Sequence, residues 1–193
     1  MKKWMPAIAI VAIIALWGIF TNNSLVSMEE DINTQWANVE STYQRRADLI
    51  PNIVNTAKGY AEFEQETLTK VIEARSKATA VTIDPSNITP AQLEQFEKVQ
   101  GTLNSALARL LAVFERYPDL KANENFKELI NELERTENRI NVERIRYNKV
   151  VTPYNTKVRK FPNSLIAGIL GFDKKVYFES DEGTEVAPVV DFD

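Results

Sequence analysis

Residues 43–54 read YQRRADLIPNIV and lie in the middle of a long apolar pattern. At about 100° per residue, apolar side chains between positions 25 and 57 recur on one narrow stripe, which is typical of a long amphipathic helix. The stripe consists of Leu25, Met28, Ile32, Trp36, Val39, Tyr43, Ala47, Ile50, Val54 and Ala57. Pro51 removes one hydrogen bond inside it, so we expect a kinked long first helix that ends at Gly59 in a left-handed cap.

An uncharged apolar run of 17 residues, WMPAIAIVAIIALWGIF at positions 4–20, precedes this stripe. Its length approaches what a helix needs to cross a hydrocarbon core about 30 Å thick. Trp4, Trp17 and Phe20 suit the interfacial ends of such a span. A cleaved signal peptide is the alternative, but the run ends in bulky residues where cleavage needs small ones. The sequence therefore predicts an uncleaved transmembrane anchor over residues 1–23.

The charges that flank this run predict its orientation. Lys2 and Lys3 precede it, and the next positive charge is Arg45, after several acidic residues. By the positive-inside rule the N-terminus then lies in the cytoplasm. We expect a single-pass protein of the cytoplasmic (inner) membrane, with the remaining domain outside the cytoplasm, in the periplasmic space where there is one.

Three more amphipathic segments follow the first stripe. One is predicted over residues 61–81, with Phe63, Val71, Ala74, Ala78 and Val81 facing inward. Thr89 and Gln92 form a capping box that starts the next, which ends near residue 117. The last runs from about residue 123 to 151. These patterns predict an all-α fold in which the transmembrane helix is followed by an antiparallel four-helix bundle over residues 24–160.

Two short segments complete the chain. SLIAGILGF, residues 164–172, is apolar but too short to span a bilayer. As part of a segment over residues 161–178, it either closes the end of the bundle or lies on the membrane surface, where Lys174 and Lys175 would support it. Residues 179–193 contain six acidic side chains and no basic one, which predicts a disordered tail.

The composition excludes several classes of function. The chain has no Cys and no His, which removes cysteine and serine–histidine hydrolases, His-containing zinc sites and Glu-x-x-His di-iron bundles. The net charge is −4 and basic residues are interleaved with acids, so nucleic acid is not expected as a partner. We expect no enzyme activity, no cofactor and no metal.

Polar side chains interrupt the apolar faces of three helices. Arg46 lies at the edge of the first stripe, whereas Arg45 points nearly the opposite way. The third and fourth segments carry Gln100, Asn104, Glu115, Glu137, Arg144 and Asn148 on their inner arcs. Breaking a buried ion pair costs about 3–5 kcal/mol, so such charges need partners. We predict an interior network in which Arg46 pairs with Glu115 or Glu137.

Arg144 and Asn148 are expected close to this network. It either fixes the register of the helices, as polar residues in coiled-coil seams do, or binds a ligand and performs acid–base chemistry, or forms a docking site for another protein. Glu134 and Glu137 are also spaced to hold a divalent cation, but such pairs are common on solvated helices.

Six motifs, in this order along the chain, resemble the LemA family of bacterial membrane proteins. They are NNSLV (22–26), YQRRADLIPNIV (43–54), KGYAEFE (58–64), ERYPDLKAN (115–123), TENRINVERIRYN (136–148) and PYNTKVRKFP (153–162). Asn22 departs from the family pattern, which usually has Tyr there. The resemblance implies one N-terminal membrane helix, a helical bundle and no known enzymatic activity. Its implied themes are scaffolding, membrane remodelling and quality control beside a membrane metalloprotease.

The leading hypothesis is a non-enzymatic, membrane-anchored scaffold or interaction module of the bacterial cell envelope. We expect it to form a homo-oligomer and to contact an envelope protein. One alternative is an adaptor or regulatory partner of a membrane protease, with residues 186–190 as a recognition strand. A second alternative is a membrane-remodelling protein, and a third is an enzyme that uses the interior network.

Overall fold

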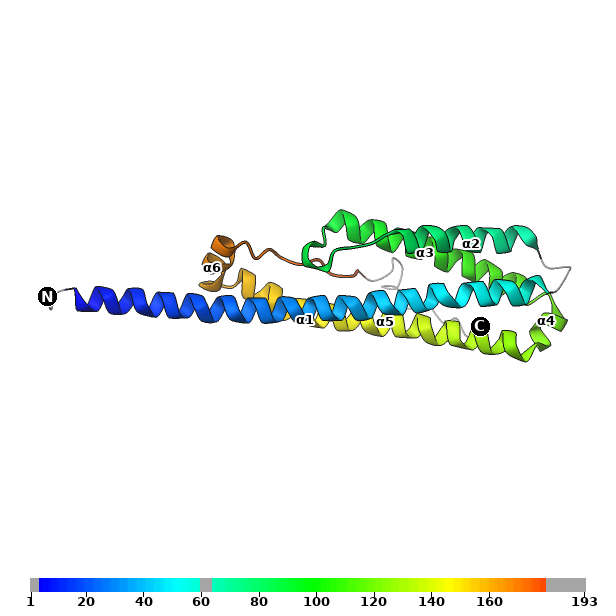
Figure 1. Cartoon of the computed structure of the whole chain (residues 1–193), viewed down its shortest axis with the longest axis horizontal. Helices are drawn as coiled ribbons and strands as arrows, with labels where there is room; N and C mark the ends of the chain where they lie inside the picture. Colours follow the sequence, from blue (N-terminus) through cyan, green and yellow to red (C-terminus); the bar gives the residue numbers. More distant parts are fainter. Residues whose placement is uncertain (1–3, 60–63, 180–193) are drawn as a thin grey trace, which may run out of the picture.

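The longest element, α1 (Met5–Lys58), is one helix of 54 residues. It joins the apolar run to the amphipathic stripe without a break, and Figure 1 shows it as a continuous rod drawn from blue to cyan. Nine of the ten predicted stripe residues are buried, and Met28 is half-buried. A helix of this length forms because the stripe gives it an apolar face to bury along most of its course.

The computed structural model describes residues 4–59 and 64–179. Predictions that concern Lys2, Lys3, Phe63 and residues 180–193 lie outside the described residues. Within the described ranges every regular element is helical. After α1 these elements are α2 (Gln65–Ala80), the 3-10 turn η1 (Pro85–Asn87), α3 (Pro90–Phe114), α4 (Pro118–Ala122), α5 (Glu124–Arg159) and α6 (Asn163–Leu170).

The predicted four-helix bundle is not confirmed, because the part of the chain that the structure describes contains six α-helices. Pro118 starts the short α4, and Asn123 caps the next helix by accepting a hydrogen bond from the Phe126 N–H at 3.0 Å. α5 then continues through Pro153 to Arg159, beyond the predicted end near residue 151. The fold is all-helical with a long apolar first helix.

One predicted helix cap is confirmed and one is not. The capping box of Thr89 and Gln92 starts α3 as predicted. Gly59 ends α1 but has φ −67° and ψ −11°, so the predicted left-handed cap is wrong at this position. Its N–H instead bonds to the Thr56 carbonyl at 3.3 Å. The left-handed cap occurs at Gly171, after α6, where φ is +77°.

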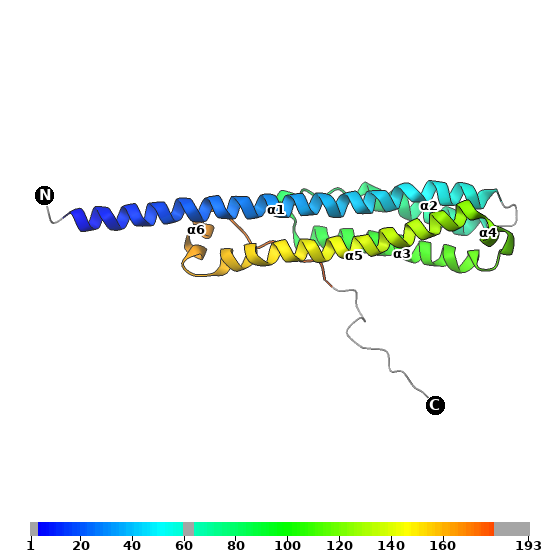
Figure 2. The same ribbon diagram turned by 90° about the horizontal axis from the view of Figure 1, so that it is seen from below.

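Pro51 lies inside α1, and the helix passes through it. Figures 1 and 2 show no interruption of the rod, and a bend at this proline stays a prediction.

The apolar run is the part of α1 that other helices cover least. Trp4 and Phe20 are exposed, as are all residues from 7 to 16, and Trp17 is half-buried. Over this run α1 is long and apolar enough to cross a membrane. Exposed rather than buried apolar side chains are the pattern of a lipid-facing helix, which suggests a membrane anchor.

Beyond the run, α1 and α5 lie side by side in both views, while α2 packs against α3 and also contacts α1 (Figures 1 and 2). The buried apolar residues form two clusters. The distal cluster, farther from the apolar run, consists mainly of Ile50, Ile53, Val54, Leu68, Val71, Leu103, Leu107, Leu110, Phe114, Phe126 and Leu133. The proximal cluster consists mainly of Leu25, Ile32, Trp36, Tyr43, Phe96, Ile140, Tyr147, Tyr154 and Phe178.

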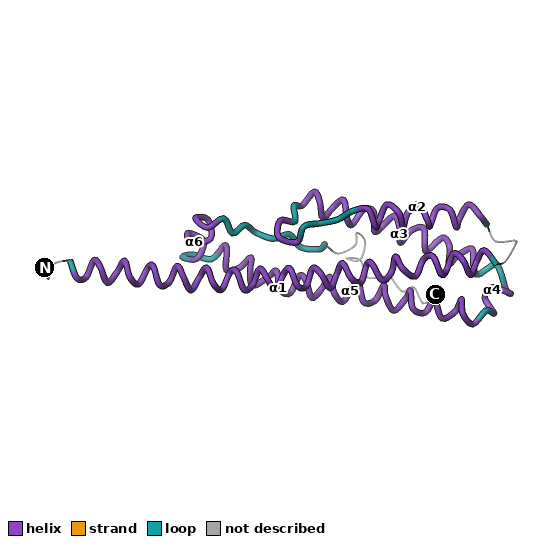
Figure 3. The backbone as a smooth tube through the Cα atoms, in the orientation of Figure 1, coloured by secondary structure: helices purple, strands orange, loops and turns teal. Residues whose placement is uncertain are grey.

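The last described segment contributes to the proximal cluster. Residues 171–179, here called the strap, leave α6 and run back along the other helices without regular structure (Figure 3). α6 itself contacts both α1 and α5. The strap brings Phe178 into the core, where it is 4% exposed.

Candidate functional site

A buried cation, Arg46, lies between the helices at the centre of the molecule and is 1% exposed. Its Nη1 donates to Glu137 Oε1 at 2.8 Å and also to Asn104 Oδ1. Its Nη2 donates to Gln100 Oε1, and its Cζ lies 5.0 Å from the centre of the Tyr43 ring. The planar guanidinium therefore joins α1 to α3 and α5 at one level. Lysine, a point donor, cannot make this set of bonds from one position.

The Arg46 cluster lies between the two apolar clusters. Along α1 it falls between Tyr43, in the proximal cluster, and Ile50, in the distal one. Along α5, Glu137 likewise separates Leu133 from Ile140. A polar layer at one level of a helical core favours the alignment that pairs it, because any shift leaves a charge unpaired.

The predicted partners of Arg46 fare differently. Glu137 pairs with it and is about one-third exposed at 33%. Glu115 does not join the cluster, because it is exposed and pairs with Lys121. Although Glu115 and Asn104 share a helical phase, they are eleven positions apart. At 1.5 Å per residue this is roughly 16 Å along the axis, too far for Arg46 to reach.

Arg144 and Asn148 serve the strap rather than Arg46. Arg144 Nη2 donates to Glu97 Oε1 at 2.8 Å and to the Glu179 carbonyl at 2.7 Å. Its Cζ also lies 5.0 Å from the centre of the Phe178 ring. This second polar group is thus separate from the Arg46 cluster and holds the end of the strap.

Two asparagines of α5 hold the backbone of the strap. Asn148 Nδ2 donates to the Phe178 carbonyl at 2.8 Å, and its Oδ1 accepts from the Phe178 N–H at 3.0 Å. Asn155 makes the same pair of bonds with Lys175, both at 2.8 Å. Each side-chain amide satisfies one N–H and one C=O, as a neighbouring strand would. On the strap, these bonds involve only backbone atoms.

Two side chains of the strap supply what the backbone bonds do not. Phe178 stacks on Trp36 with ring centres 5.7 Å apart and planes 5° apart, and Tyr147 meets it edge-on at 5.3 Å. Lys175 Nζ lies 2.5 Å from Glu29 Oε1 and donates to the Ser86 carbonyl at 2.7 Å. Lys175 thereby ties the strap to α1 and η1.

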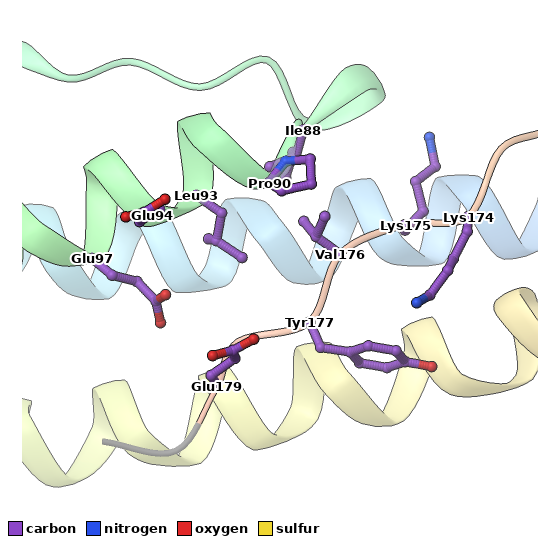
Figure 4. Close-up of a pocket in the computed structure, with 10 residues that line it drawn as sticks. All are labelled: Ile88, Pro90, Leu93, Glu94, Glu97, Lys174, Lys175, Val176, Tyr177 and Glu179. Carbon is purple, nitrogen blue, oxygen red and sulfur yellow. The ribbon is translucent and has the colours of Figure 1, made fainter. Parts of the chain in front are cut away.

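An open cleft of about 490 Å³ lies between the start of α3 and the strap (Figure 4). α3 lines it with Leu93, Glu94 and Glu97, and the strap lines it with Lys174 and Tyr177 among others. The strap wall also contains Lys175 and the acidic Glu179, so acidic groups come from both walls and basic groups from the strap. No group of three or more His, Cys, Asp or Glu side chains in residues 4–59 and 64–179 is placed to hold a metal ion.

The three buried tyrosines of the proximal cluster are held in their neutral form, because burial raises the pKa of each phenol. Burial raises the pKa of Tyr147 to about 12. Burial likewise raises the pKa of Tyr154 to about 12, with Glu29 adding to the effect. For Tyr43 burial outweighs the opposing charges of Arg144 and Arg46, and its pKa is about 12. Phenols with such pKa values are poor bases at neutral pH.

Sequence reasoning missed three buried residues of this region, which are Asn155, Glu143 and Phe178. Asn155 follows Asn148 by seven positions, and this heptad spacing could have indicated a common inward face. Glu143 is 2% exposed and accepts from Gln35 Nε2 at 2.8 Å. Its spacing from the inward Ile140 and Tyr147 was the available signal. Trp36 was predicted to be inward, but nothing in the local pattern indicated Phe178 as its partner.

A family model described as the LemA family matches residues 35–192. The chain belongs to the LemA family. The matched range includes the Arg46 cluster and the whole strap, whereas the apolar run and Glu29 precede it.

Named relatives of this LemA-family chain cover most of it. Magnetosome protein MamQ 2 from Paramagnetospirillum magneticum is 28% identical over 194 residues, covering 91% of this chain and 70% of that protein. Protein LemA from Metamycoplasma hominis is 27% identical over 161 residues, covering 83% and 69%. Magnetosome protein MamQ from Magnetospirillum gryphiswaldense is 26% identical, covering 90% and 71%.

Proposed function

We propose that this LemA-family protein is a non-enzymatic, membrane-anchored scaffold of the bacterial cell envelope. In this proposal the N-terminus is cytoplasmic, the anchor crosses the inner membrane, and the four long helices form one antiparallel bundle outside the cytoplasm. The observation that carries it is the continuity of α1, because one helix serves as both apolar anchor and core element.

A continuous helix transmits position rigidly. About 35 residues of α1 follow position 23, where the predicted anchor ends, and at 1.5 Å per residue they extend roughly 50 Å beyond it. α5 packs along this rod and the Arg46 cluster fixes its alignment. Such a rod would hold the surface of the bundle at a fixed distance from the bilayer. This rigidity is useful for assembling other proteins, whereas turnover of a substrate does not require it.

The polar groups also support a structural rather than a catalytic role. The Arg46 guanidinium is engaged by three side chains of two other helices, and the buried tyrosines are neutral at ordinary pH.

The absence of cysteine from the chain gives a direct test of topology. Gln44→Cys, on an exposed position of α1, should react in intact cells or spheroplasts with a maleimide that does not cross membranes. Thr102→Cys, exposed on α3, should behave in the same way. Labelling of both only after the membrane is opened would overturn the proposed orientation.

Crosslinking in cells tests whether the chain binds a second copy of itself or another envelope protein. A photo-crosslinker at Arg109, which is exposed on α3, should give a dimer-sized product or a heterologous envelope adduct in cells. A chain that remains monomeric by light scattering in detergent and yields no adduct from several such positions would contradict a scaffold.

The likeness to proteins named for the magnetosome favours a second candidate, a role in membrane remodelling. Addition of the purified protein to vesicles should then change their shape in electron micrographs, and a variant without residues 4–20 should not. The adaptor role depends on residues 186–190, outside the described range, and stays a prediction.

A further inference from the structure

We infer that α6 is a membrane-interface helix: it lies beside the outer end of the anchor and binds the lipid bilayer through its apolar outer face. This inference rests on the anchor proposed above. It assigns a lipid-binding role to residues 161–174 that the helical scaffold alone does not require.

The first observation is where α6 is attached. Ile166 Cδ1 lies 3.7 Å from the position that a Cβ on Gly18 would occupy, which is ordinary packing distance. Thr21 Oγ1 lies 3.5 Å from Asn163 Oδ1, and Thr21 is 4% exposed. Gly18 falls within the apolar run and Thr21 directly follows it. α6 is therefore fixed against the anchor itself, beyond the end of the main core (Figures 1 and 2).

The second observation is depth. A helix needs about 20 residues to cross a hydrocarbon core roughly 30 Å thick, so a span that begins at Trp4 ends near residue 23. Gly18 then lies within about 8 Å of that end, at the boundary between acyl chains and head groups. A helix packed at this level meets lipid whether or not it has a face suited to it.

The third observation is that α6 has such a face. Phe161 is 78% exposed and Ile169 is 80% exposed, with Leu165 and Leu170 also exposed. The opposite side carries Ala167, which is 1% exposed and packs into the proximal cluster. Ile19 and Phe20 of α1, next to the residues that contact α6, are exposed as well. The anchor and α6 thus both present apolar side chains that no other part of the described chain covers, as expected of lipid contact.

The fourth observation is the charge around this face. Arg159 and Lys160 precede α6 and Lys174 follows it, and all three are exposed. Cationic side chains at the edge of an apolar face favour anionic head groups. Lys175, which the sequence offered for the same role, does not take part, because it is buried and paired with Glu29.

Site-directed spin labelling of the full chain in vesicles of phosphatidylcholine and phosphatidylglycerol tests the inference. The sites are Ile169→Cys on α6, Ile13→Cys in the apolar run and Thr102→Cys on α3, all exposed positions. Oxygen concentrates in acyl chains, whereas a nickel chelate stays in water. The ratio of oxygen to nickel collisions should be several-fold higher at Ile169 than at Thr102, and should approach that at Ile13.

Each other outcome is decisive. A water-like ratio at Ile169 with a lipid-like ratio at Ile13 overturns the α6 inference and leaves the anchor intact. Water-like ratios at both sites overturn the anchor. Low collision with both reagents at Ile169, with spin–spin broadening that unlabelled protein dilutes away, means that a second copy covers the face and also overturns the inference.

A charge variant separates lipid recognition from simple burial. Replacement of Arg159, Lys160 and Lys174 by Gln should make the Ile169 label shallower in vesicles with phosphatidylglycerol and leave it unchanged in phosphatidylcholine alone. Arg45→Gln, at an exposed cation far from α6, is the matched control. It should leave the depth of the Ile169 label unchanged in both kinds of vesicle. If the triple-Gln variant and the unsubstituted chain show the same Ile169 depth in both kinds of vesicle, then the three cations do not bind anionic head groups.

Discussion

The two apolar clusters of this molecule differ in composition and in what encloses them. The distal cluster is largely aliphatic and is built by helices alone, from α1, α2, α3, α4 and α5. The proximal cluster contains most of the buried aromatic rings, and α2 does not reach it because α2 ends at Ala80. The loop around η1, α6 and the strap take its place, through Ile83, Ile88, Ala167 and Phe178.

This difference teaches how a core continues where a helix stops. Helices satisfy their own backbone groups, whereas an extended strap does not, so the proximal half needs Asn148 and Asn155 to hold strap backbone. Large rings then fill the wider space that thin extended chain leaves. The distal half is closed by local helix pairing, and the proximal half depends on a segment that returns from the far end of α5.

The largest expected effect comes from removing the ring that completes the proximal cluster. Phe178→Ala should lower the free energy of unfolding by roughly 3–5 kcal/mol, because a buried ring is lost from a packed site. Hydrogen exchange should accelerate around residues 140–155 before it does around residues 103–113. Leu103→Ala, in the distal cluster, should cost about 2–5 kcal/mol with the opposite regional pattern. Identical exchange patterns for the two variants would mean that the clusters are one cooperative unit.

The next effect concerns the layer between the clusters. Arg46→Ala should destabilise by about 3 kcal/mol, the low end for a broken buried pair, since Glu137 is partly solvated. Arg45→Ala, at the neighbouring position, should cost less than about 1 kcal/mol because its pair with Glu132 is exposed. Urea melts of both variants measure this. Equal losses would show that the buried layer does not set the alignment.

Alkaline pH should weaken the proximal half selectively, because Tyr43, Tyr147 and Tyr154 all lie there. Their folded pKa values of about 12 exceed the ordinary value of 10.0, so the stability that they contribute is complete below pH 10 and is lost as pH rises toward 12. Each contributes at most roughly 2–3 kcal/mol at about 1.4 kcal/mol per pKa unit. In a variant whose other three tyrosines, at positions 60, 117 and 177, are replaced by Phe, absorbance at the phenolate band should rise together with proximal hydrogen exchange. Phenolate formation near pH 10 in this variant while it is still folded would contradict the prediction.

The smallest effect should come from removing one of the two asparagine side chains that bind the strap backbone. Asn155→Ala leaves the N–H and C=O of Lys175 without these bonds and should cost about 1–3 kcal/mol. Thr152→Ala, one turn away on an exposed position, is a control expected to be near neutral. Thermal melts followed by circular dichroism compare the two. A loss for Asn155→Ala no greater than that of its control would remove the Asn155 side chain from the account of the proximal half.

The periodicity of the sequence was enough to predict the distal half and most of α1. There the fold is built from local helices, and stripes such as Ile50, Val54 and Ala57 carry the information. The capping box at Thr89 was readable for the same reason, since its partners are three residues apart. α4 and α6 were not predicted as helices because each is too short to establish a period.

The proximal half was harder to predict because its contacts join distant positions. Asn155 and Lys175 are 20 residues apart, and Trp36 and Phe178 are 142 apart. Helical phase also gives no axial position, so it placed Glu115 beside Arg46 when the two lie at different levels. Phase indicates which face a residue occupies, and only assembly of the helices shows which levels meet.

The path of the strap fixes where the final acidic segment leaves the molecule. Glu179 is bonded to Arg144, and 15 positions of α5 separate that residue from the helix end at Arg159, or about 22 Å along the axis. The described chain therefore ends on the flank of the rod and not at its tip or its base. A protein that binds Glu179 in this position would meet the rod from the side.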